Sequence, residues 1–88
     1  MQMIYPEHGA SLFIPVELSG ESGRIVLRAA HRSPDATVHW DLDGDFRGST
    51  RREHQLAIAI GAGEHRLTLT DDLGAHLEIA FRTVSTRP

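Results

Sequence analysis

The feature that most constrains this chain is a hydrophobic alternation with a period of two residues, broken by turn residues about every 8–12 positions. A period of two places successive side chains on opposite faces of a strand, whereas a helix requires a period of about 3.6. In residues 37–42, Val38, Trp40 and Leu42 alternate with polar residues. The pattern predicts an all-β, immunoglobulin-like antiparallel β-sandwich of about seven short strands.

The alternation and its turn residues also predict the strands and the residues that face the core. We expect strands at 24–30, 37–42, 46–50, 54–60, 65–70 and 75–84, after two short, proline-ended edge pieces at 4–5 and 12–14. Asp43-Gly44 predicts a hairpin turn. Residues 1–84 form one domain in this interpretation, and residues 85–88 form a frayed tail. The residues expected to face inward are Ile25, Leu27, Ala29, Val38, Trp40, Leu42, Leu56, Ile58, Ile60, Leu67, Leu69, Leu77, Ile79 and Phe81.

Composition excludes several classes of function. The chain has no cysteine and no lysine, so disulfides, thiolate zinc sites, Schiff-base lysines and Ser-x-x-Lys nucleophiles are absent. A formal net charge of −3 does not suit a nucleic-acid binder. No apolar run approaches the roughly 18 residues of a membrane span, so we expect no direct membrane contact. No signal-peptide pattern opens the chain, so an export signal would lie upstream.

Two groups of residues suggest metals, and each has a simpler interpretation. Acidic residues in Asp41-Leu42-Asp43-Gly44-Asp45 have calcium-loop spacing, but the sixth and twelfth loop positions hold Phe46 and Arg52. We therefore favour a hairpin turn with solvated carboxylates. The histidines lack the i, i+4 spacing of a helical zinc motif. Three of them are expected to hydrogen-bond loop backbone, namely His31, His54 and His65. The alternatives are a transition-metal site and a pH-sensing or binding role. No cofactor is predicted.

No catalytic apparatus is evident in the sequence. A Gly-x-Ser-x-Gly nucleophile elbow is absent, and Ser49 is better explained as part of a strand or turn. Adjacent carboxylates at Asp71 and Asp72 point apart on a turn, unlike the facing pair of a glycosidase. We expect a domain that is not an enzyme.

Ordered phrases along the chain resemble one protein family. They are Tyr5-Pro6 with Gly9, Pro15, 29–32, 34–37, Trp40-Asp41-Leu42-Asp43-Gly44, 48–50, 54–57, 63–68 and 71–74. Together they resemble the C-terminal domain of bifunctional (class A) penicillin-binding proteins of the 1C subtype, roughly from Ile4 to Val84. Departures at Asp41 and at Phe46-Arg47 put any surface function of the Asp43–Arg47 hairpin in doubt.

The resemblance implies a place in cell-wall biogenesis. Such proteins are anchored in the inner membrane and act in the periplasm, where a glycosyltransferase domain and a transpeptidase domain build peptidoglycan. The resembled domain follows the transpeptidase domain and carries neither active site. The favoured hypothesis is a non-catalytic interaction or positioning module, whose partner is a periplasmic protein or the adjacent transpeptidase domain. Alternatives are a module that binds peptidoglycan, through glycan or stem peptide, and a structural cap that binds nothing else.

A candidate binding surface follows from exposed aromatic and basic residues near the Asp43–Arg47 hairpin. Phe46 is expected at the hairpin tip with Arg47, Arg51 and Arg52 around it, and guanidinium groups bind carboxylates well. Two further candidates for the binding surface, His31 and His54, lie in the phrases that resemble the family. A sugar-binding site should show an exposed aromatic near polar groups in a groove, whereas a protein-binding site should show an apolar patch or an unpaired strand edge.

Overall fold

A computed structural model describes residues 1–14 and 23–85 of the chain. Within these ranges the chain forms eight strands and no helix. The strands are β1 (Gln2–Tyr5), β2 (Ser11–Ile14), β3 (Arg24–Ala30), β4 (Thr37–Leu42), β5 (Asp45–Arg51), β6 (Gln55–Ala59), β7 (Gly63–Asp71) and β8 (His76–Ser85).

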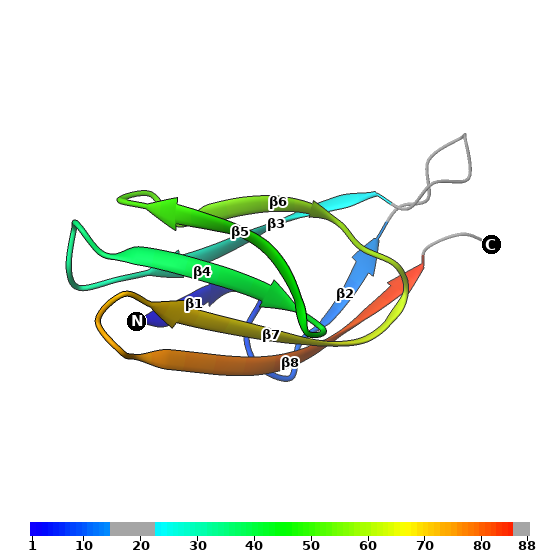
Figure 1. Ribbon diagram of the computed structural model, residues 1–88. Helices are drawn as coiled ribbons and strands as arrows, with labels where there is room; N and C mark the ends of the chain where they lie inside the picture. The colour runs from blue at the N-terminus through cyan, green and yellow to red at the C-terminus, as the bar shows by residue number, and fades with distance from the viewer. Residues whose placement is uncertain (15–22, 86–88) are drawn as a thin grey trace.

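The strands form two sheets, which Figure 1 shows as two layers. One sheet has the order β1-β3-β6, and the other has the order β2-β8-β7-β4-β5. This arrangement confirms the predicted all-β sandwich, with eight strands where about seven were expected.

One strand pairing corrects the expectation of a purely antiparallel fold. In the described ranges, β2 runs parallel to β8, and the other pairings are antiparallel. The chain leaves β1 in one sheet and reaches β2 in the other along the free edge of β8. There the Gly9 N–H donates to the Ala80 carbonyl over 2.7 Å, and the Arg82 N–H donates to the Ala10 carbonyl over 2.8 Å. These bonds hold the crossing segment so that β2 continues in the direction of β8.

The core lies between the sheets and follows the predicted alternation. Trp40, Leu27, Leu67 and Leu69 are fully enclosed, and each contributes about 1.5–3 kcal/mol through the burial of its apolar surface. Leu56 and Leu77 were also expected to face inward, but they are only partly buried and pack against the margin of the core. The other predicted inward residues are buried: Ile25, Ala29, Val38, Leu42, Ile58, Ile60, Ile79 and Phe81.

The β4–β5 hairpin has the turn that its sequence predicts. Leu42 pairs with Asp45, so Asp43 and Gly44 alone form the loop, with φ values of 52° and 87°. Positive φ at both central residues defines a type I′ turn, whose twist matches that of the flanking strands. A bulge follows, because Trp40 pairs with Gly48 while Asp41 pairs with Phe46.

Candidate functional site

The surface residues predicted near the β4–β5 hairpin lie along β5, at the edge of the five-stranded sheet. The Phe46 side chain is 63% exposed, and its ring centroid lies 6.4 Å from that of His39. Arg47 occupies the bulge, while Arg51 and Arg52 lie at and just beyond the other end of the strand. Phe46 and Arg51 are about 17 Å apart along the strand. The structure therefore exposes these residues without bringing them into one cluster.

Polar side chains surround Phe46 on the outer face of its sheet. The His39 ring Nδ1 lies 2.7 Å from the Ser49 hydroxyl, and Asp41 is the cross-strand partner of Phe46. Arg51 forms a long, exposed ion pair with Asp35, with 4.0 Å between Nη2 and Oδ1. Such exposed pairs contribute little to stability. An exposed ring beside hydrogen-bonding groups is compatible with stacking on a sugar.

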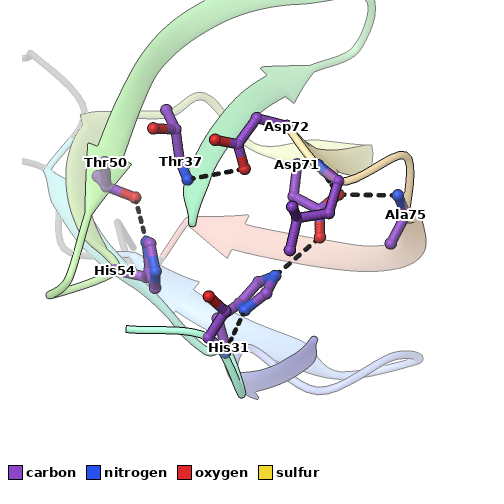
Figure 2. Close-up of polar contacts among 9 residues, drawn as sticks. His31, Thr37, Thr50, His54, Asp71, Asp72 and Ala75 are labelled. Atoms are coloured by element: carbon purple, nitrogen blue, oxygen red, sulfur yellow. Dashed lines mark hydrogen bonds and ion pairs between the residues drawn. The ribbon is translucent and has the colours of Figure 1, made fainter. Parts of the chain in front are cut away.

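The side chain of His31, a predicted surface candidate, forms a contact between the two sheets (Figure 2). Its Nδ1 accepts a hydrogen bond from the Ser33 N–H over 2.9 Å. Because Nδ1 accepts, the neutral ring carries its proton on Nε2, which lies 2.7 Å from Oδ2 of Asp71. The contact joins the end of β3 in one sheet to the end of β7 in the other. The bond from Ser33 is the loop-backbone contact that was expected of this histidine.

Asp71 collects three donors in this contact. Its Oδ1 accepts from the Leu73 and Ala75 N–H groups over 3.0 and 2.8 Å, and its Oδ2 faces His31. Its side chain is 2% exposed. The hydrogen bond from His31, followed by that from Ala75, lowers the pKa of the Asp71 carboxyl below its usual value. The carboxylate thus stays ionised and holds the β7–β8 turn.

His54, the other predicted surface histidine, lies inside the protein. Its Nδ1 lies 2.7 Å from the Thr50 hydroxyl, which accepts a hydrogen bond from the Trp40 indole N–H over 2.8 Å. The residue is 5% exposed, and its Nε2 has no hydrogen-bond partner among the described residues. Burial, with the nearby His31 ring, lowers the pKa of the His54 imidazole. The expectation of a surface position for His54 is wrong, because the residue is buried and its ring contacts the Thr50 side chain rather than loop backbone.

The carboxylate of Asp43 is also held by protein donors. Its Oδ1 accepts from the Arg66 N–H over 2.8 Å, and its Oδ2 lies 2.7 Å from His65 Nδ1. Burial raises its pKa, but the bonds to His65 and Arg66 outweigh this effect and lower it. His65 Nε2 in turn lies 2.8 Å from the Gly61 carbonyl, the kind of loop contact expected of this histidine. Both carboxylate oxygens of Asp43, one of the three acidic residues in the calcium hypothesis, therefore fasten the hairpin to β7.

Sequence reasoning missed a groove on the outer face of the three-stranded sheet. The groove encloses about 590 Å³ and runs over β1 and β3, with Phe13 of β2 at its margin. Several apolar side chains in it are exposed: Ile4 by 55%, Tyr5 by 43%, Phe13 by 73% and Val26 by 45%. Arg24 and Arg28 complete its outward rim. The signal was present, because the predicted inward register of Ile25 and Leu27 turns Val26 outward.

The described residues hold no group of three His, Cys, Asp or Glu side chains arranged for a metal ion. Comparison with protein-family models matches residues 1–81 to the Penicillin-Binding Protein C-terminus Family. The chain belongs to this family. No curated protein and no solved structure matches the chain.

Membership in the penicillin-binding protein C-terminus family indicates the kind of protein to which the groove and the β5 edge belong. The family is the C-terminus of bifunctional penicillin-binding proteins, so the chain has an accessory place in peptidoglycan synthesis. The described part of the chain contains no helix that is long and apolar enough to span a membrane.

Proposed function

We propose that this domain is a non-catalytic interaction module of a bifunctional peptidoglycan synthase, acting in the periplasm as part of a membrane-anchored protein. It holds the neighbouring catalytic part in place or binds a periplasmic protein partner. The observation that supports this proposal is the apolar groove on the outer face of β1 and β3. Contiguous exposed apolar surface is costly in water and marks sites of protein–protein contact.

The position of the groove also favours contact with the catalytic part. β1, which lines it, begins at Gln2, and a domain preceding the family's C-terminal domain would connect at this end of the chain. A preceding domain would be tethered on the side of the strand that lines the groove. The tether would raise the effective concentration of the two surfaces and allow a modest groove to bind.

A photo-crosslinking amino acid at Tyr5 tests this function in the bacterium that carries the chain. Because the domain and the transpeptidase belong to one polypeptide in a bifunctional protein, we expect an intramolecular adduct, which mass spectrometry of the digested protein would locate in the transpeptidase part. Val26→Asp should reduce the adduct by about tenfold or more, because it places a carboxylate in the apolar contact. Thr70→Asp, on the outer face of the other sheet with His39 and His76 as its cross-strand partners, is the matched control and should leave the adduct unchanged.

The same experiment can contradict the proposal. Equal adducts in the two aspartate variants would show that the groove is not the contact surface. A Val26-dependent adduct with a separate periplasmic protein, identified by the same mass spectrometry, would favour the protein-partner arm. No Val26-dependent protein adduct at all would remove the interaction function from this face.

Phe46 supports a second candidate function, the binding of peptidoglycan. An exposed aromatic ring beside His39 and Asp41 offers stacking and hydrogen bonding together, and Arg47 offers a cation to a stem-peptide carboxylate. This candidate uses the face opposite the groove, so the two functions can be tested separately.

Co-sedimentation with purified peptidoglycan sacculi tests the second candidate. If it holds, pelleting should be saturable, and Phe46→Ala with Arg47→Ala should weaken it by about tenfold, through the loss of stacking and of one charged contact. Val26→Asp should pellet like the unaltered domain. Pelleting that the double variant retains, or none at all, would count against wall binding through β5.

A further inference from the structure

The two outer faces of the sandwich differ in how their charges are balanced. On the five-stranded sheet, Arg66 pairs with Glu78 and Arg82 pairs with Glu64, each at 3.1 Å. On the three-stranded sheet, β1, β3 and β6 contain no Asp or Glu. Their two cations, Arg24 and Arg28, form no ion pair within the described part of the chain. The groove is thus a locally positive surface on a chain with a formal net charge of −3.

The register of β3 places these cations at fixed positions around an apolar centre. Burial alternates strictly along the strand, so Arg24, Val26 and Arg28 share the exposed face. Alternate residues on a strand are about 6.6 Å apart, so the two arginines bracket Val26 over about 13 Å. Tyr5 lies beside Arg28 across the β1–β3 pairing.

The neighbouring strand leaves this face open to a partner. β6 presents Ala57 opposite Val26 and Ala59 opposite Arg24, and both alanines are exposed. These small side chains form a low, uncharged shelf beside the arginine row. A partner can therefore approach the sheet closely and bury Val26 while its polar groups reach the guanidinium groups.

We propose that the groove binds a polypeptide segment which presents an apolar side chain between two carboxylates spaced by about 13 Å. The inference rests on the proposed interaction function and specifies the chemistry of its partner. The apolar side chain packs against Val26, Tyr5 and Phe13. The carboxylates accept charge-assisted hydrogen bonds from Arg24 and Arg28.

The charge distribution argues against a second copy of the chain as the occupant. An isologous contact places the same patch on both sides of the interface. Arg24 and Arg28 would then meet the same arginines of the other copy, with no carboxylate on the three strands to separate them. Like charges in such a contact repel, whereas an acidic segment satisfies both guanidinium groups.

Selection from a random peptide library displayed on phage tests the proposal directly. The intact chain should enrich peptides with Asp or Glu on both sides of an apolar residue. Arg24→Gln with Arg28→Gln should weaken the binding of a selected synthetic peptide by about tenfold or more, measured by fluorescence anisotropy. Arg66→Gln with Arg82→Gln should leave binding within about twofold, because those cations lie on the other sheet. Near-ultraviolet circular dichroism should confirm that both variants keep the packing of Trp40.

The outcomes separate this inference from the function on which it rests. Enriched peptides that are apolar but carry no acidic residues, and that Val26→Asp abolishes, would overturn the acidic chemistry and leave the groove as an interaction site. Acidic peptides whose affinity does not depend on Arg24 and Arg28 would also overturn it. Peptides that bind independently of both Val26 and the arginines would overturn the inference together with the groove's role. Groove-dependent dimers in sedimentation, lost in Val26→Asp, would make a second copy the occupant and contradict the proposal.

Discussion

Replacing Thr50 by valine should lower the free energy of unfolding by about 2–4 kcal/mol, although it removes only one hydroxyl group. That hydroxyl accepts from the Trp40 indole and contacts His54 Nδ1. Without it, both ring nitrogens lie next to a methyl group and remain cut off from water. A buried polar group without a partner costs about 1–3 kcal/mol. The loss is large for a domain whose total stability is about 5–15 kcal/mol.

Urea unfolding followed by the fluorescence of Trp40, the one tryptophan in the sequence, measures this effect. Thr68→Val is the matched control, because Thr68 lies on the outer face of β7 and its side chain forms no hydrogen bond with the described residues. We expect a change of less than about 0.5 kcal/mol there. If the two variants lost equal stability, the Thr50 bridge would have no special role.

Stability should also fall as the pH is lowered, in two stages set by different groups. Burial, together with His31, holds the pKa of His54 below its usual value of 6.5. The unfolded chain therefore binds a proton at His54 more readily than the folded chain does. The stabilisation from neutral His54 is fully present at pH values above the pKa of this residue in the unfolded chain. It is lost as the pH falls toward the lower pKa of the folded chain.

The second stage belongs to carboxylates. The hydrogen bond from His31, with those from Ala75 and Leu73, lowers the pKa of Asp71 below its usual value of 3.8. Asp43 is likewise lowered, since its bonds to His65 and Arg66 outweigh its burial. The stabilisation from these two carboxylates is fully present at pH values above their pKa in the unfolded chain. It disappears as the pH falls through their lower pKa values in the folded chain.

Urea unfolding at pH values of about 7.5, 5.5 and 3.5 would resolve the two stages. In His54→Asn, a side chain that does not titrate replaces the ring, so the loss between the first two values should largely vanish. His76→Asn, at an exposed position, should keep the whole dependence. A His54→Asn variant as acid-sensitive as the unaltered domain would contradict the assignment of the first stage.

Local pattern was enough to predict the fold class, the inward register and the Asp43-Gly44 turn. Side-chain direction on a strand and the sign of φ in a tight turn depend on neighbouring residues, so Leu27, Trp40 and Leu67 could be placed in the core from alternation alone. The parallel contact of β2 with β8 depends on how the chain passes between sheets. No local pattern encodes that passage.

The candidate sites were less predictable, for the same physical reason. His54 opens a segment expected to be a strand, and its contact with Thr50, which also binds Trp40, depends on how the chain between β5 and β6 folds. His31 and Asp71 are likewise brought together only by the stacking of the sheets. The groove was partly encoded in the outward register of Val26. The absence of carboxylates from its three strands gains meaning only once those strands are known to pair.

The parallel pairing of β2 with β8 has a consequence for the order of assembly. Ser11 pairs with Arg82, so the contact closes a loop of about seventy residues and raises the contact order of the fold. Loop closure of this length makes the pairing a late and slow step. A chain emerging vectorially from a ribosome or a translocon exposes β2 long before β8 exists to receive it. Until the final residues arrive, the edge of β7 also lacks a neighbour, which makes the incomplete domain a natural client for chaperones.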